Sequence, residues 1–233
     1  LEDLKKVGKR SDHDELIPAF IRMMGAIQNL VGDAGMLAAA AVEGKLDTRA
    51  DATRHNGDYR KVIEGVNKTL DAIIGPLNVA AEYVDRISKG DIPPRITDTY
   101  HGDFNELKNN LNGCIDAVNG LLKEADGLIL AVQEGRLGER GDAGAFAGDW
   151  GKLVGGMNGL MAAVGEPVDE LITVLRRMAV NDYTAKMVKK YDGIWNDLEN
   201  ATNEVQARIL NTIRITNNIS NGDLTDLDGL KKV

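Results

Sequence analysis

Apolar residues recur along this chain in a fixed order of steps. Starting at residues 59, 104 and 150, the steps are 3, 4, 4, 3, 4, 3, 4 and 3. Such steps place all these residues on one narrow stripe of a helix, as in a coiled coil. The pattern predicts helices of about 31 residues, roughly 46 Å long, one of them at 58–89. The stripes are Tyr59, Val62, Val66, Leu70, Ile73, Leu77, Ala80, Val84 and Ile87; Phe104, Leu107, Leu111, Ile115, Val118, Leu122, Ala125, Ile129 and Val132; and Trp150, Leu153, Met157, Met161, Val164, Val168, Leu171, Leu175 and Met178.

Variants of the same stripe occur towards both ends of the chain. The first runs from Leu16 to Ala41, and His13 takes the position of its leading aromatic residue. The last runs from Trp195 to Ile219, includes threonines, and lacks the consecutive pair of four-residue steps. That pair is a stutter, which locally unwinds a left-handed supercoil. We therefore expect the last junction to be the softest of the array.

Connectors of about a dozen residues separate the predicted helices. They contain Pro93 and Pro94 in one copy and five glycines between 135 and 148 in another, which do not suit a helix interior. Each connector begins at a turn marker, which holds Gly44, Gly90, Gly135 or Gly222, or Asn181 in one copy. Each complete connector offers a pair of positions four residues apart, mostly apolar, which we expect to anchor it to the helices: Leu46 and Ala50, Ile92 and Ile96, Leu137 and Gly141, Tyr183 and Met187.

A repeat of 45 or 46 residues organises these elements. Asn67, Asn112, Asn158 and Asn203 each follow an aromatic residue by eight positions and are spaced by 45, 46 and 45 residues. The repeat predicts complete units at 29–74, 75–120, 121–165 and 166–207, with partial units at 1–28 and 208–233. Because each helix is longer than one unit needs, it must be shared by two successive units.

The predicted architecture is all-α and dimeric. A stripe this narrow cannot enclose a core between two helices of one chain, so two chains should form a four-helix bundle. Antiparallel neighbours need only about 2 to 8 linking residues, whereas a dozen can return over about 25 Å. The two helices of a unit should therefore run parallel. A monomeric antiparallel bundle is the alternative, and the long Gly/Pro connectors oppose it.

The composition of the chain argues against several kinds of binding partner and several cellular locations. The net charge of −8 argues against nucleic acid and anionic membranes. No apolar run is long enough for a membrane span, and no signal-peptide pattern occurs. A chain with the single cysteine Cys114 cannot form an internal disulfide, which favours the cytoplasm; we interpret Cys114 as a small buried residue. The first residue, Leu1, suggests a piece of a longer protein.

Catalytic and metal-binding motifs are not found in the sequence. It lacks a phosphate-binding loop, a His-Glu-x-x-His motif and a cysteine pair, so we predict no enzyme activity, cofactor or metal. We interpret His13, His55 and His101 as surface or helix-capping residues. Asp58, Asp103 and Asp149 are interpreted as helix N-caps, with Glu106 completing a capping box after Asp103. The aromatic residues Tyr59, Phe104, Trp150 and Trp195 are interpreted as core residues rather than a ligand site.

These elements resemble the HAMP domain of bacterial chemoreceptors and sensor histidine kinases. That family has a proline opening its first helix, then a Gly-Asp-Leu turn, and then a connector with two anchors. Here Pro76 leads to Gly90-Asp91-Ile92 and Pro167 leads to Asn181-Asp182-Tyr183, each over fourteen residues. The chain departs from the family at the start of the second helix, where Gly-Asp-aromatic replaces an acidic-Glu-x-Gly motif, and at Gly141.

The resemblance implies a parallel homodimeric four-helix bundle that relays signals by changing its packing. Its partners would be upstream sensory and downstream signalling domains, and its setting would be the cytoplasm, in chemotaxis. The alternative is a static coiled-coil spacer or dimerisation scaffold. Stutters, glycines within the helices and the kinks expected at two prolines favour the relay. We expect the signalling residues to be Pro76, Pro167, Gly44, Gly90, Gly135, Gly222, Leu46, Ile92, Ile96, Leu137, Tyr183 and Met187.

Overall fold

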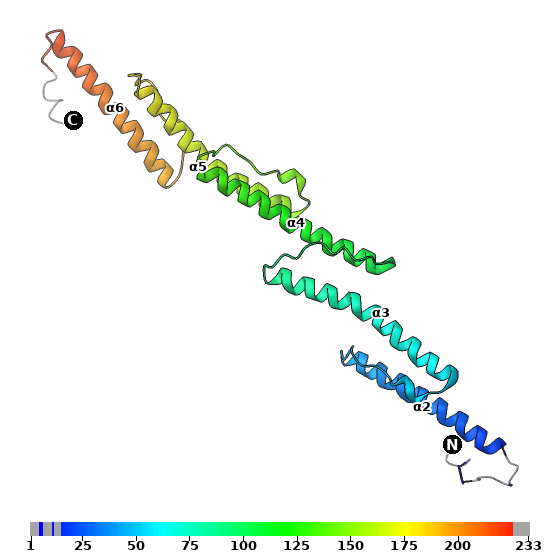
Figure 1. Cartoon of the computed structure of the whole chain (residues 1–233). Helices are drawn as coiled ribbons and strands as arrows, with labels where there is room; N and C mark the ends of the chain where they lie inside the picture. The colour runs from blue at the N-terminus through cyan, green and yellow to red at the C-terminus, as the bar shows by residue number, and fades with distance from the viewer. Residues whose placement is uncertain (1–4, 7–10, 12–14, 226–233) are drawn as a thin grey trace. The chain divides into compact units, whose positions relative to one another are not determined.

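The computed structural model describes residues 5–6, 11 and 15–225. Within them the fold is all-α, as predicted, and no strand occurs. The helices are α2 (Leu16–Val42), α3 (Gly57–Ser88), α4 (Gly102–Gln133), α5 (Asp149–Met178) and α6 (Ile194–Ser220), shown in Figure 1. The helix predicted at 58–89 is α3, which begins and ends one residue earlier. His13 lies outside the described residues.

Four connectors join these helices: the first (43–56), second (89–101), third (134–148) and fourth (179–193). The first and third contain short 3-10 helices, η1 (Ala52–Arg54) and η2 (Ala143–Ala145). The chain divides into two compact units, 1–115 and 116–233, with the boundary inside α4. Each unit contains two of the connectors.

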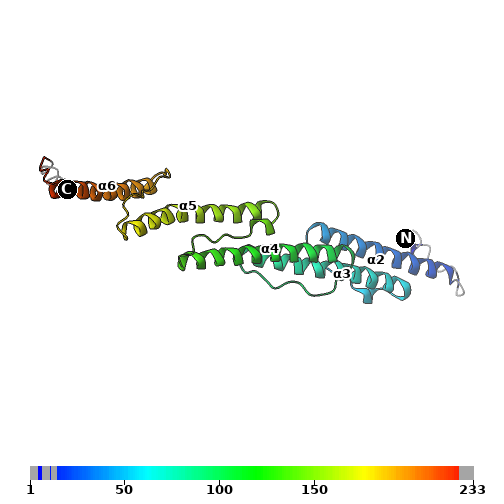
Figure 2. The ribbon, with the colours of Figure 1, turned by 90° about the horizontal axis from the view of Figure 1, so that it is seen from above.

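Successive helices run in the same direction, as predicted. In the first unit, the end of the first connector lies at His55, which contacts Asp33 in the middle of α2. In the second unit, Tyr191 at the end of the fourth connector contacts Glu170 of α5. Each connector therefore returns along the helix that precedes it, and Figures 1 and 2 show this path for the third connector between α4 and α5.

A residue with a left-handed backbone stands two or three positions after the last residue of each helix. The residue after it donates its N–H to a carbonyl five positions earlier, as Lys45 does to Ala40 at 2.8 Å, which is a Schellman motif. The left-handed residues are those of the predicted turn markers: Gly44, Gly90, Gly135, Asn181 and Gly222, with φ between 61° and 80°. Glycine and asparagine tolerate this conformation best, which explains the marker.

The N-cap interpretation of the three aspartates is wrong. Asn56 precedes α3 and Gly148 precedes α5 as N-cap, so Asp58 and Asp149 lie in the first turns, as does Asp103 in α4. The helices begin earlier because a glycine with positive φ turns the chain into each of them. An aspartate in the first turn still interacts favourably with the positive end of the helix dipole.

Some of the residues buried within one chain form small clusters, while others, such as Ile115, Val174 and Ile215, are buried outside them. Leu37, Ala50 and Ile63 form one cluster, which joins α2, the first connector and α3. Leu128, Ala131 and Met161 form another between α4 and α5. Cys114 is exposed, so its interpretation as a buried residue is wrong; it precedes the buried Ile115 on α4.

The predicted stripes remain largely open to solvent in the single chain. We call the exposed large apolar residues of these stripes in α3 to α6 the seam: Val62, Val66, Ile73, Leu77, Val84, Leu122, Ile129, Val132, Trp150, Leu153, Val164, Leu175 and Val205. In the part of the chain that the structure describes, no helix is long and apolar enough to cross a membrane.

Candidate functional site

Each connector is held to the following helix by one asparagine side chain. The amide of Asn112 accepts the N–H of Ile96 at 2.7 Å and donates to the carbonyl of the same residue at 3.0 Å. We call this double hydrogen bond the asparagine clamp. It recurs between Asn67 and Ala50, Asn158 and Gly141, and Asn203 and Met187, with distances from 2.7 to 3.2 Å.

The clamp gives the connector backbone the partners that it would otherwise lack. A buried N–H or carbonyl without a partner costs about 1–3 kcal/mol. Ala50, Ile96, Gly141 and Met187 are all buried, and they are the second residues of the predicted anchor pairs. Among the first residues of the pairs, Leu46 is 41% exposed, while Ile92, Leu137 and Tyr183 are half-buried.

Gly141 shows that the clamp works without an anchoring side chain. A Cβ at this position would lie 2.9 Å from Glu124 Oε2 and 2.9 Å from Val154 Cγ1. Val154 is fully buried and fills the space that an anchor would occupy. The third connector therefore approaches the helices more closely than a larger residue would allow.

A second contact fixes the end of each connector. A ring residue stands two positions before the glycine that leads into the next helix: His55, Tyr100, Phe146 or Tyr191. A matching position lies on the preceding helix, three residues after the proline slot (Leu30, Pro76, Leu121 or Pro167): Asp33, Val79, Glu124 or Glu170. We call the contact between this helix position and the connector the latch.

The first latch is a buried histidine–aspartate pair. His55 Nε2 lies 2.6 Å from Asp33 Oδ2, and the His55 side chain is 2% exposed. The interpretation of His55 as a surface or capping residue is therefore wrong. His101 is exposed and follows the ring position of its own connector, so the two histidines are not equivalent in the repeat.

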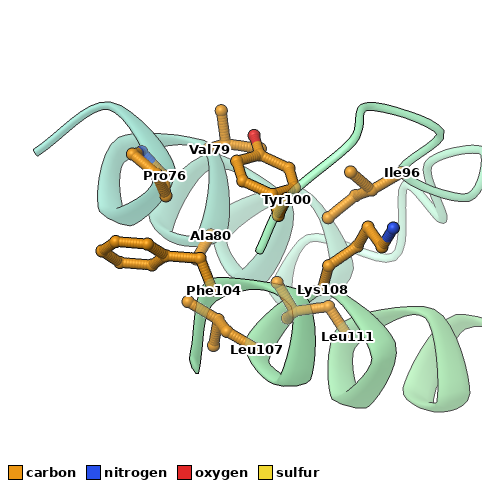
Figure 3. Close-up of a pocket in the computed structure, with 9 residues that line it drawn as sticks. All are labelled: Pro76, Val79, Ala80, Ile96, Tyr100, Phe104, Leu107, Lys108 and Leu111. Carbon is orange, nitrogen blue, oxygen red and sulfur yellow. The ribbon is translucent and has the colours of Figure 1, made fainter. Parts of the chain in front are cut away.

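The second latch is apolar. Val79 and Tyr100 line a small cavity of about 10 Å³ together with Pro76 and Ala80 of α3, Ile96 of the connector, and Phe104, Leu107, Lys108 and Leu111 of α4 (Figure 3). Pro76 thus lies where the shared helix α3 meets the second connector and α4.

The third latch is a single hydrogen bond from a backbone N–H. Glu124 Oε2 accepts the N–H of Asp142 at 3.1 Å. The ring residue Phe146 lies against Gly120, where an added Cβ would be 2.9 Å from the ring.

The fourth latch has the most hydrogen bonds. Glu170 accepts the N–H of Val188 at 2.8 Å, the N–H of Lys189 at 3.3 Å and the Tyr191 hydroxyl at 2.7 Å. Burial by itself would raise the pKa of Glu170, but these three hydrogen bonds outweigh it and lower that pKa. Burial and the contact with Glu170 raise the pKa of Tyr191 to about 12. Gln206 adds a bond of 2.6 Å from its side chain to the carbonyl of Tyr183.

Both helix-internal prolines lie inside continuous helices, Pro76 in α3 and Pro167 in α5. Pro167 is fully buried, and two residues earlier an added Cβ at Gly165 would lie 3.2 Å from Leu137 Cβ. Leu137 therefore packs where α5 passes from one predicted unit to the next.

An apolar groove of about 320 Å³ runs between α4 and α5. It is lined by Ala125, Leu128, Ile129, Val132, Leu137, Met157, Leu160, Met161 and Val164. Among the described residues, no group of three or more His, Cys, Asp or Glu side chains is placed to hold a metal ion.

Sequence reasoning found the asparagines as spacing markers but missed their partners. It also missed the latch, because the residues at both latch positions differ between copies. Aligning the copies on the glycine at the start of each of the helices α3 to α6 would have shown that a ring residue stands two positions before it. The charged or apolar helix position could then have been found from the proline slot.

The family model of the HAMP domain matches the chain at residues 54–120 and 145–212, together more than half of its length. Each matched region includes one helix-internal proline and two of the clamping asparagines. No solved structure matches the chain.

Proposed function

Because the chain belongs to the HAMP domain family as a tandem array, we propose that it relays conformational signals as a parallel homodimer of stacked four-helix bundles. HAMP domains are non-catalytic relay modules that stand between input and output domains.

The exposed seam carries the proposal of a dimer. Monomeric proteins rarely expose long continuous apolar surfaces. Here Val62, Ile73, Leu122 and Leu153 are each between 43% and 52% exposed, and all lie on predicted coiled-coil positions. A second copy packed in the same direction would cover each stripe with its own equivalent and fill the groove between α4 and α5.

The modules of the proposed dimer are 29–74, 75–120, 121–165 and 166–207, flanked by partial modules 1–28 and 208–233. Each complete module contains one connector, one asparagine clamp and one latch, which supports these boundaries. In this scheme α3, α4, α5 and α6 each pass from one module into the next. A change in packing of one module would then be transmitted along a continuous helix.

During switching, the packing between the seams of the two copies would change, while the asparagine clamps keep the connectors attached to the helices. The prolines Pro76 and Pro167 remove a backbone hydrogen bond inside the shared helices, which favours a joint there. The resemblance to chemoreceptor arrays supports a role in chemotaxis, on the cytoplasmic side, between sensory and signalling domains.

Disulfide cross-linking tests the dimer. In a Cys114→Ser background, Leu122→Cys on the seam should cross-link rapidly, because parallel packing places equivalent residues opposite each other. The neighbouring Lys123→Cys, which is exposed off the seam, is the matched control. A monomeric mass with no cross-linking at either position would refute the dimer.

A second experiment separates a relay from a static spacer. Val205→Cys reports on the seam of the fourth module, and Ile63→Ala disturbs the buried cluster of the first module. A relay predicts that Ile63→Ala changes the cross-linking rate at Val205 by about fivefold or more. The control Lys61→Ala alters only an exposed side chain of the same helix. An unchanged rate at Val205 would identify a spacer.

A further inference from the structure

We propose that the first connector is a proton-responsive element, held tightly when His55 is protonated and more loosely when it is neutral. His55 and Asp33 are both buried, and neither lies on the seam that the relay would use. The proposal concerns contacts within one module of one chain, so it stands independently of the dimer and of the relay.

Comparison of the four latches shows what is special about the first. The second joins Val79 and Tyr100 and has no carboxyl group. The third and fourth use glutamates that accept backbone N–H groups, which do not titrate, and in the fourth also the Tyr191 hydroxyl, whose pKa is raised to about 12. The first pairs a carboxylate with an imidazole, the side chain whose charge ordinarily changes between about pH 5 and 8.

The contact distance suits a hydrogen bond between two charged partners. At 2.6 Å, the contact from His55 Nε2 to Asp33 Oδ2 is shorter than most neutral N–H···O hydrogen bonds. A bond between two charged partners is roughly twice as strong as a neutral one. A neutral imidazole can still donate one hydrogen bond, so loss of the proton weakens the latch without abolishing it.

Arg54 and Asp51, both of the first connector, interact with the pair. Arg54 Nη1 lies 4.0 Å from Asp33 Oδ1, so it forms a long ion pair with the aspartate. Asp51 interacts electrostatically with His55 and Arg54. Among the described residues, no charged side chain of α3 forms an ion pair with either member of the latch.

Amide hydrogen exchange of the full chain tests the proposal at about pH 5.5 and about pH 7.5. After correction for intrinsic exchange, protection of the segment 46–56 should be about tenfold higher at the lower pH. The segment 92–101, which carries the apolar latch, is the internal control and should keep the same protection. His55→Gln, which retains a hydrogen-bond donor that does not titrate, should remove the difference, while the exposed His101→Gln should retain it.

Each other result contradicts the proposal. Equal protection of the segment 46–56 at the two pH values would refute it. So would a pH difference that survives His55→Gln, or one shared equally by both segments. Lower protection at the lower pH would show that burial of the charge outweighs its pairing. Circular dichroism of His55→Gln checks that the helices remain formed, and Asp33→Asn provides a second variant that should remove the difference.

Discussion

The amide of Asn112 gives the backbone of Ile96 the pairing that a neighbouring strand would give it in a sheet. Its removal leaves a buried N–H and a buried carbonyl without partners. We expect Asn112→Ala to lower the local free energy of opening of the second connector by about 3 kcal/mol. Hydrogen exchange of the segment 92–101 measures it. Asn110→Ala, an exposed asparagine of the same helix, is the control and should change little.

Gly141 stands where no larger side chain fits without a shift of the surrounding structure. Substitution with alanine places a Cβ 2.9 Å from both Glu124 Oε2 and Val154 Cγ1, so the connector must move away from the helices. We expect Gly141→Ala to destabilise the third connector by about 1–3 kcal/mol, in the range of overpacked cores. Gly138→Ala in the same connector meets nothing within 4 Å and should be nearly neutral. Equal effects of the two substitutions in thermal unfolding would contradict the close approach.

Because of Glu170, the attachment of the fourth connector should weaken in acid. Its folded pKa lies below the ordinary value of 4.5, so the folded form binds fewer protons than the detached form. The stability that it contributes is therefore present above the ordinary pKa and is lost as the pH falls through the folded pKa.

The fluorescence of Trp195 should report this loss, because Trp195 and Tyr191 line the same surface depression. In a Trp150→Phe background, we expect a change in emission below about pH 4.5 that is absent in Glu170→Gln. The same acid transition in both proteins would assign it to another carboxyl group.

At the scale of elements, the step pattern predicted the helices well because a coiled-coil stripe constrains every third or fourth residue. The turn markers at Gly44 and Gly90 were equally readable, since only a few residue types tolerate a left-handed backbone. The latch at His55 was not readable from one copy, because its two residues lie 22 positions apart and only folding brings them together. The depth of burial of His55 likewise depends on the connector path, which no local pattern specifies.

Pro76 should weaken α3, a helix that two proposed modules share. It has no N–H to donate to the carbonyl of Ala72, which weakens α3 where two proposed modules meet. We expect Pro76→Ala to slow hydrogen exchange of the α3 amides around residues 73–80, by stabilising the helix about 1–2 kcal/mol. Val79→Ala, which removes packing from the same cavity but no hydrogen bond, should accelerate it. Faster exchange in Pro76→Ala would show that proline packing outweighs the lost hydrogen bond.

Across the whole molecule, stability should decline towards the C-terminal part of α6. The stripe of α6 includes Thr202, Thr212 and Thr216, whose hydroxyls each donate to a carbonyl four residues earlier. These hydrogen bonds satisfy the hydroxyl groups, so threonine is tolerated on an apolar stripe. Each threonine nevertheless takes the place of a larger apolar side chain. At about 25 cal/mol per Å² of apolar surface buried, the seam of α6 gains less from being covered than those of α3 to α5.

Hydrogen exchange along the full chain should therefore show the segment 205–220 opening before the corresponding segments of α3, α4 and α5. Thr212→Leu with Thr216→Leu should slow its exchange if these positions are covered by a second copy. The matched substitution Asn217→Leu, at an exposed position off the stripe, should not. Slowing by Asn217→Leu alone would place the covered face elsewhere on α6, and the softness of this junction would then need a cause other than its threonines.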